Sequence, residues 1–226
     1  MWLINSPIGR KVVMSVTGIC LILFLTFHMS MNVVALFSAS GYNMICEFLG
    51  ANWYAVVATL GLAALAVIHI LYAFWLTLQN RKARGANKYA MTATPEKVEW
   101  ASQNMLVLGL IIVIGLLLHL YNFWWNMMAT ELIEGEMAVF GDMTNPGTTD
   151  GYGWILKTFH NPFHTIVYLV WLVAIWFHLT HGFWSALQTL GWNGKTWFCR
   201  WKVIGQIYTT LLMLGFAVVA IVFTLK

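Results

Sequence analysis

The sequence of 226 residues is 60% hydrophobic and only 9% charged, and its mean hydropathy is +0.74. A composition this apolar excludes an ordinary soluble domain and predicts an integral membrane protein. The formal net charge of +4 is small. Basic residues that set membrane topology account for it, so we expect no nucleic acid as a partner and membrane lipid as the surrounding medium.

Five apolar runs are long enough to cross a bilayer, at ~20 residues per crossing. They lie at about 12–37, 53–78, 104–128, 162–190 and 203–225. The first run is too long for a signal peptide and lacks a small-x-small cleavage site. We therefore predict an all-α integral membrane protein in which residues 1–226 form one domain with five transmembrane helices.

The Lys and Arg residues fall almost entirely on one side of the predicted membrane. They lie before the first span and in the second and fourth connections, at Arg10, Lys11, Arg81, Lys82, Arg84, Lys88, Lys97, Lys195, Arg200 and Lys202. By the positive-inside rule, the N-terminus is expected in the cytoplasm and the C-terminus outside a bacterial cytoplasmic membrane. The same charge is compatible with a docking surface for an acidic partner.

Two connections are long. The inner one, about 79–103, contains a predicted helix start at Thr94 and Pro95. The outer one, about 129–161, contains the turn-forming run "TNPGTTDGYG" and is predicted to be an acidic external flap. It ends at Asn161 and Pro162, which predict the start of the fourth span.

The three cysteines, Cys20, Cys46 and Cys199, are expected at three different levels of the membrane, which predicts no disulfide. The sequence has no C-x-x-C-H motif, so a covalently attached haem is excluded.

Histidine inside a bilayer is costly without a partner, and four of the five spans contain it. In the apolar interior of these spans the residues are His28, His69, His119, and His178 with His181, whereas His164 at the start of the fourth span is expected at the membrane interface. A single such histidine is adequately explained by a hydrogen bond between helices. Histidines in four spans favour ligands of a bound group.

The depths of these histidines form two pairs. His28 and His119 each lie nine residues before the outer end of their span, whereas His69 and His178 each lie sixteen residues after the outer start. These positions correspond to ~14 Å and ~24 Å from the outer boundary. Two bis-histidine haems at two levels would need this arrangement, because each iron takes axial nitrogens from opposite faces of the macrocycle and therefore from two facing helices.

Other ligands and roles fit this pattern less well. Zinc ligands would have to converge on one ion, and a proton relay would need carboxylates, which all lie outside the predicted spans. Gly115 and Gly182 lie one turn from His119 and His178, where a missing side chain would admit the edge of a macrocycle. Close helix packing explains these glycines equally well.

Five motifs together resemble the dihaem cytochrome b subunit of succinate dehydrogenase or fumarate reductase, in its single-subunit, five-helix type. They cover nearly the whole chain and read "SPIGRKVVMSVTG", "FHMSMNVV", "VIHILYAFW", "LLHLYNFWW" and "WFHLTHGFWSALQTLGW". The resemblance implies that the first four spans form a haem-binding bundle, with His28 and His119 as axial ligands of an outer haem b and His69 and His178 as those of an inner haem b.

The resemblance further implies a membrane anchor that conducts electrons. A flavoprotein subunit with FAD and an iron–sulfur subunit would be separate chains on the cytoplasmic face, because this sequence has no nucleotide fold and no cysteine cluster. Quinone, expected to be menaquinone, would react near the outer haem. Glu47, beside the outer start of the second span, is the candidate for proton exchange with it, and a solvated loop carboxylate is the alternative. A dimer of heterotrimers and the direction of catalysis stay open.

Two further residues are expected beside the haems. Ser15 is implied as a propionate partner by the resemblance alone. His178 and His181 lie on adjacent turns and cannot both bind one haem, and depth does not choose between them. The family pattern of a ligand histidine followed four residues later by glycine favours His178 with Gly182. His181 is then left to bond a propionate or a backbone carbonyl, with plain helix packing as the alternative.

Two competing functions come from other classes. One is the dihaem cytochrome b anchor of a hydrogenase or formate dehydrogenase, whose catalytic partners often lie outside the membrane. The predicted basic docking face here is inside, which argues against it. The other is a cofactor-free transporter or scaffold, which would be colourless when purified.

Overall fold

The computed structural model describes residues 6–84, 99–134, 146–192 and 194–226, and every regular element among them is helical. Five long helical segments carry the apolar runs: α2 (Pro7–Val34), α4 (Trp53–Arg84), α6 (Met105–His119) continued by η1 (Leu120–Ala129) and α7 (Thr130–Glu134), α9 (Pro162–Thr189) and α10 (Lys195–Leu225). Each is long and apolar enough to cross a membrane. The prediction of an all-α chain with five such helices is confirmed.

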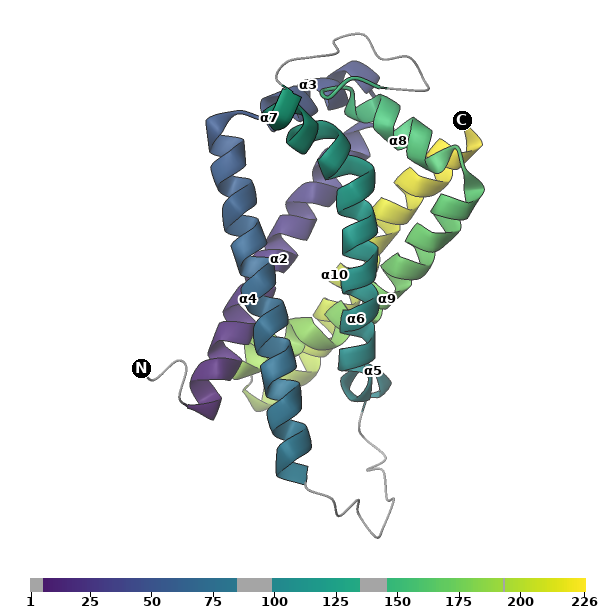
Figure 1. Cartoon of the computed structure of the whole chain (residues 1–226). Helices are drawn as coiled ribbons and strands as arrows, with labels where there is room; N and C mark the ends of the chain where they lie inside the picture. The colour runs from purple at the N-terminus through teal and green to yellow at the C-terminus, as the bar shows by residue number, and fades with distance from the viewer. Residues whose placement is uncertain (1–5, 85–98, 135–145, 193) are drawn as a thin grey trace.

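The long helices run between two ends of one bundle (Figure 1). The start of α2 and the short helix α5 (Trp100–Gln103) lie at one end, which we call the N-terminal end. The C-terminus lies at the other, the C-terminal end, together with α7, α3 (Ala39–Phe48) and α8 (Gly151–Phe159). An odd number of crossings requires the two termini to lie at opposite ends.

The packed core lies between α2, α9 and α10, because α2 contacts both of the other two helices and these pack along one another. Its central cluster consists of Ile22, Leu172, Ile175, Leu179, Leu212 and Met213. Helix α4 packs against α2, and α6 packs against α9. Ala55 is the one buried residue among the described side chains of α4, and the many exposed apolar side chains of the spans suit contact with lipid.

Side-chain caps fix where two of the spans begin. The Ser6 hydroxyl accepts a hydrogen bond from the Gly9 amide at 2.9 Å, with Pro7 at the first helical position. The Asn161 side chain likewise accepts from the Phe163 amide at 3.0 Å. Both caps satisfy amides that a helix start otherwise leaves without partners, and proline is suited to the position that follows. The helix start predicted at Asn161 is confirmed.

The helix bounds differ from those expected at several ends. The first helix starts earlier and ends at Val34 rather than near 37, and the fifth begins at Lys195 rather than near 203. The start of the fifth helix is basic and aromatic, and Arg200 stacks over the Trp197 ring at 5.3 Å. Such residues suit the membrane interface, so a hydropathy pattern does not count them within the span.

The outer connection is more regular than predicted. Residues 151–159 form α8, capped by the Asp150 carboxylate, which accepts from the Gly153 amide at 3.0 Å. Helix α8 buries Trp154, Ile155 and Phe159, so this part of the predicted external flap contains a packed helix that the sequence analysis did not predict. The turn formers "TNPGTTDGYG" overlap its start, where glycine and aspartate suit a cap as well as a turn. The helix start expected at Thr94 and Pro95 lies outside the described residues.

A π-helical stretch, η1, follows His119 directly. Two side chains within and after it bond carbonyls five residues back: the Asn126 amide donates to the Tyr121 carbonyl at 2.8 Å, and the Thr130 hydroxyl donates to the Trp125 carbonyl at 2.8 Å. Within the wider turns of the π-helix, these bonds give the Tyr121 and Trp125 carbonyls a side-chain donor. Helices of this kind occur frequently at functional sites.

Candidate functional site

Four histidines from four helices meet as two pairs. His28 on α2 and His119 on α6 have ring centroids 5.8 Å apart and planes at 81°. His69 on α4 and His178 on α9 have centroids 6.4 Å apart and planes at 67°. These are the two pairs expected from depth, so the structure brings together the partners that the sequence assigned to each other.

The spacing within each pair fits a metal ion held between two imidazoles. A bond from an imidazole nitrogen to a first-row metal is ~2.0 Å, so rings on opposite sides of one ion have facing nitrogens ~4 Å and centroids ~6 Å apart. Both observed separations, 5.8 and 6.4 Å, lie near this value. Two trans imidazoles are the axial ligand set of a b-type haem, so these residues fit that group.

Hydrogen bonds between helices do not account for three of the four rings. The Nδ1 atoms of His119 and His178 are buried and have no partner among the described residues. Leaving a buried polar group unsatisfied costs ~1–3 kcal/mol. The Nδ1 atom of His28 lies 3.4 Å from Nδ2 of Asn32, which belongs to the same helix. Among the described residues, His69 is the one of these four histidines whose ring nitrogen has a hydrogen-bond partner on another helix, so hydrogen bonding between helices explains these residues poorly.

Aromatic side chains enclose the His28–His119 pair. Phe24 stacks on His28 with 5.4 Å between centroids, and Phe123 and Trp171 lie 5.1 and 5.7 Å from the His119 ring. An apolar enclosure of this kind lowers the local dielectric and limits access of water. Neutral imidazole is the state that binds a metal.

A chain of hydrogen bonds links this pair to the surface helix α3. The Tyr42 hydroxyl donates to Asn32 Oδ1 at 3.1 Å, and Asn32 Nδ2 donates to the His28 carbonyl at 2.8 Å. Burial raises the pKa of the Tyr42 hydroxyl first, and the neighbouring Cys46 adds to the shift, so Tyr42 stays a neutral donor. The turn of α2 that carries His28 is therefore fixed from the C-terminal end.

The His69–His178 pair has a different anchor. Thr17 of α2 lies with its Oγ1 atom 3.0 Å from His69 Nδ1. Thr17 is buried, and its hydroxyl also lies 2.8 Å from the Val13 carbonyl of its own helix. Sequence reasoning missed Thr17, although it lies inside the "SVTG" motif that carried part of the resemblance.

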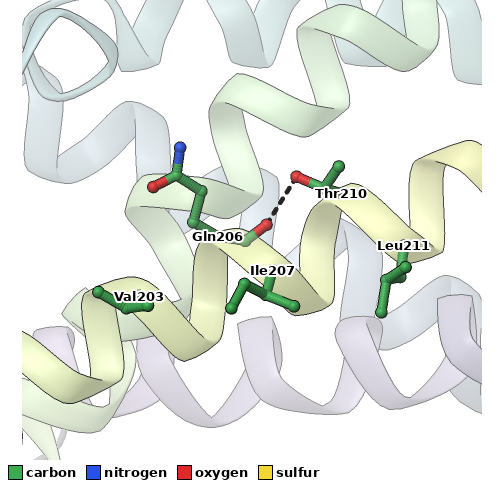
Figure 2. A pocket seen from close by; sticks show the side chains of 5 residues that line it. All are labelled: Val203, Gln206, Ile207, Thr210 and Leu211. Carbon is green, nitrogen blue, oxygen red and sulfur yellow. Dashed lines mark hydrogen bonds between the residues drawn. The ribbon is translucent and has the colours of Figure 1, made fainter.

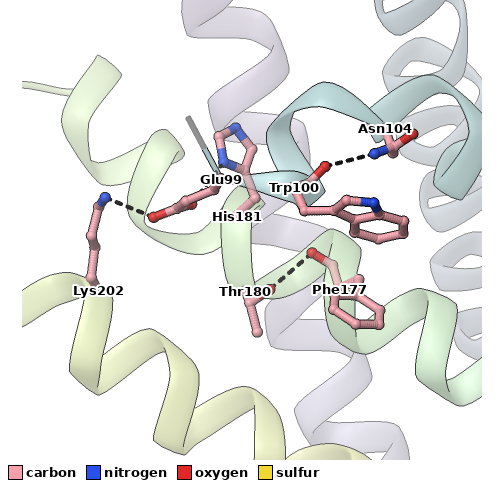
Figure 3. Close-up of polar contacts among 7 residues, drawn as sticks. All are labelled: Glu99, Trp100, Asn104, Phe177, Thr180, His181 and Lys202. Atoms are coloured by element: carbon pink, nitrogen blue, oxygen red, sulfur yellow. Dashed lines mark hydrogen bonds and ion pairs between the residues drawn. The ribbon is translucent and has the colours of Figure 1, made fainter. Parts of the chain in front are cut away.

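His181 makes contacts unlike those of His178 (Figure 3). Its Nδ1 atom lies 3.4 Å from Glu99 Oε2, and Glu99 Oε1 accepts from the Lys202 ammonium at 2.7 Å. We call these three residues the Glu99 cluster. It joins the chain segment before α5 to α9 and α10 at the N-terminal end.

The charges of the Glu99 cluster determine the state of its carboxylate. Burial by itself would raise the pKa of Glu99, but the hydrogen bonds and charges of Lys202 and His181 outweigh it and hold this pKa below the usual value. The carboxylate is therefore ionised at neutral pH. Sequence reasoning missed Glu99, which was counted only among the acidic residues outside the spans.

Ser15 and Glu47, the other residues expected at the site, form no hydrogen bond with the histidine pairs among the described residues. The Ser15 hydroxyl is buried and donates to the Lys11 carbonyl of its own helix at 2.9 Å. Glu47 is exposed on α3, and its carboxylate bonds no described residue. Glu131, which was not singled out from the sequence, accepts instead from the Ala51 amide at 3.3 Å and ties α7 to the start of α4.

The two glycines expected to admit a macrocycle edge differ. A Cβ atom at Gly182 would meet nothing within 4 Å, whereas one at Gly115 would collide with the Trp171 indole. The Trp171 Nε1–H donates to the Ile112 carbonyl at 3.1 Å, which seats the indole on this glycine. Close packing, one of the two explanations that the sequence left open, therefore accounts for Gly115.

A hollow of about 320 Å³ lies apart from these residues on the surface of α10 (Figure 2). Its lining comes from α10 alone: Val203, Gln206, Ile207, Thr210 and Leu211. The Thr210 hydroxyl is engaged, because it donates to the Gln206 carbonyl at 2.7 Å. None of the lining residues belongs to the histidine pairs or to the Glu99 cluster.

The fold and these contacts define a helical protein with five helices able to span a membrane and two interhelical histidine pairs. Comparison of the chain with known protein families, with curated proteins and with solved structures found no match. Its function is therefore argued from its own residues.

Proposed function

We propose that the chain is the dihaem cytochrome b subunit that anchors a succinate dehydrogenase or fumarate reductase complex in a bacterial cytoplasmic membrane. The observation that carries the proposal is the pairing of four histidines from four helices at metal-compatible ring spacings, 5.8 and 6.4 Å. Support also comes from the buried, unpartnered Nδ1 atoms of His119 and His178, which are costly in a bundle of protein alone.

In this proposal His28 and His119 hold the outer haem b, and His69 and His178 hold the inner one. Bound haem supplies reversible one-electron transfer. The protein's part is to present neutral imidazoles at fixed angles, to exclude water with aromatic side chains and to keep the two irons at separate depths. The N-terminus lies in the cytoplasm in this arrangement, as the basic residues of the N-terminal end favour.

The N-terminal end is proposed as the docking face for the iron–sulfur subunit, which in turn contacts the flavoprotein subunit with FAD. Its described basic residues include Arg10, Lys11, Arg81, Lys195 and Arg200. A positive face favours association with an acidic partner and speeds the encounter. Quinone, expected to be menaquinone, would react near the outer haem, with exposed Glu47 exchanging the proton.

The test is to purify the tagged chain from its native membrane in mild detergent. We expect two haem b per chain, a flavin-containing and an iron–sulfur chain in the same particle, and reduction of the haems by succinate. His28→Ala and His69→Ala should each remove one haem. A folded, monodisperse chain without colour would establish the scaffold or transporter alternative, and co-purifying hydrogenase or formate dehydrogenase chains would establish the other.

A further inference from the structure

The hydrogen bond between Thr17 and His69 joins two helices at the level of the inner pair. Thr17 lies on α2 and is 5% exposed, and its Oγ1 atom is 3.0 Å from His69 Nδ1 on α4. A Cβ atom at the next residue, Gly18, would lie 3.4 Å from His69 Cε1. This turn of α2 therefore supports the edge of the His69 ring as well as bonding its nitrogen.

The direction of the hydrogen bond follows from the other contacts of the hydroxyl. A threonine hydroxyl has one hydrogen and two lone pairs. Thr17 Oγ1 lies 2.8 Å from the Val13 carbonyl and 3.1 Å from the Met14 carbonyl, and neither carbonyl can donate. These carbonyls can accept the hydroxyl hydrogen, and in that arrangement the lone pairs of the hydroxyl accept from His69 Nδ1.

This direction fixes the tautomer of His69. Nδ1 carries the proton and donates it to Thr17, so Nε2 has a free lone pair for a metal. Metal-ligating histidines nearly always donate their second ring nitrogen to an acceptor, which orients the ring and raises the basicity of the ligating nitrogen.

The other three rings lack such an acceptor among the described residues. Nδ1 of His119 and of His178 has no partner. Nδ1 of His28 faces an amide nitrogen, Asn32 Nδ2, which is itself a donor to the His28 carbonyl. Thr17 therefore distinguishes His69 from the remaining histidines of both pairs.

We propose that Thr17 is a positioning residue that fixes the tautomer and orientation of His69 and lowers the midpoint potential of the inner haem. The inference rests on the proposed function, because it concerns the residue that tunes one of the proposed ligands. A more basic imidazole donates more electron density and stabilises the oxidised iron, so removal of the acceptor should raise the potential. Loss of the anchor should also let the ring rotate from its 67° angle to His178.

The experiment compares Thr17→Val, which keeps the shape but not the acceptor, with Thr17→Ser, which keeps the acceptor. Thr77→Val is the matched control, since Thr77 makes the same kind of bond to its own helix, to the Ala73 carbonyl at 2.8 Å, and contacts no histidine. Each variant is purified as the intact complex, and redox titration and the ferric low-spin electron paramagnetic resonance spectrum are recorded. Both readouts are independent of turnover.

We expect Thr17→Val to raise the midpoint potential of the inner haem, to shift its resonance, and to weaken retention of this haem by ~10-fold or more. Thr17→Ser and Thr77→Val should resemble the wild type. If Thr17→Val does not assemble, Thr17→Ala, which is smaller and also lacks the hydroxyl, takes its place. If a variant without the hydroxyl retains both haems with unchanged potential and spectrum, the inference about Thr17 is wrong. The proposed function is not affected by that result. A wild-type protein without haem would overturn the proposed function as well.

Discussion

The Nδ1 atom of His181 lies 3.4 Å from the Oε2 atom of Glu99, whereas His178, one turn earlier on the same helix, faces His69. His178 and His181 of α9 therefore have different partners at different levels. This separation bears directly on which of them serves as a ligand.

We predict that His178→Ala abolishes the bis-histidine spectrum of the inner haem and stops electron flow to quinone. His181→Ala should retain both haems and at most shift the inner potential, because His181 contacts the Glu99 cluster rather than the opposing ring. Optical spectra and a redox titration of the two purified variants distinguish these results. The reverse outcome, with haem lost only from His181→Ala, would show that the ligand lies on the other turn.

Stability should depend on pH through Glu99. Its pKa in the folded state lies below the ordinary value of 4.5, so the ionised carboxylate contributes stability at neutral pH. The contribution is lost as the pH falls below 4.5 and through the folded-state pKa. Because the side chain is 38% exposed, its ion pair with Lys202 should contribute only ~0.2–1 kcal/mol.

The measurement is the unfolding temperature of Glu99→Gln and wild type in detergent between pH 7 and pH 3.5. Glu99→Gln should be less stable at pH 7, and the difference should shrink towards acid pH and at high salt. Glu134→Gln, which changes an exposed carboxylate of α7, is the control. A difference that grows as the pH falls would contradict the assignment.

Packing at Gly115 gives a third prediction. Gly115→Ala forces the Trp171 indole to move, so we expect a loss of ~1–3 kcal/mol in the free energy of unfolding. Gly109→Ala on the same helix meets nothing within 4 Å and should be neutral or slightly stabilising. Since Trp171 also packs on His119, Gly115→Ala should perturb the outer haem spectrum. Equal stability of the two variants would show that the indole repacks without cost.

The parts of the molecule that depend on local pattern could be predicted from the sequence. Hydropathy located the five long helices, and the Asn161–Pro162 pair located a helix start. Residue counting along the spans paired His28 with His119 and left His178 or His181 as the partner of His69, and the family resemblance favoured His178. Each of these depends on helix rise or on neighbouring residues. The ends of the helices could not be placed well, because interfacial Trp, Lys and Arg residues extend a helix beyond its apolar run.

Contacts between distant segments could not be predicted. Thr17 lies 52 residues from His69 in the sequence, and Glu99 lies 82 residues from His181. Only the folded structure shows that the residues of each pair are in contact. The two explanations of Gly115 could not be separated for the same reason, since nothing near it in the sequence indicates that Trp171 covers it.

The last prediction concerns the membrane potential. In the proposed complex, electrons enter from the cytoplasmic, N-terminal end and reach quinone near the outer haem, so they cross most of the bilayer. Helices α2, α4, α6, α9 and α10 contain no Asp or Glu, and the described carboxylates near the spans, including Glu99 and Glu131, lie at the bundle ends. No carboxylate route for a compensating proton is therefore evident along these helices.

Quinone reduction by succinate should then be assisted by an inside-negative potential, by up to ~2.3 kcal/mol per electron for each 100 mV, and the reverse reaction should be opposed. The measurement is turnover of the complex in sealed vesicles of known orientation, before and after an uncoupler. The uncoupler should slow succinate oxidation by quinone and accelerate fumarate reduction by quinol, and detergent-solubilised complex should respond to neither. If the uncoupler does not change turnover in the vesicles, then either the quinone site lies at the N-terminal end or protons cross the membrane together with the electrons. Either result would contradict transmembrane charge separation by this subunit.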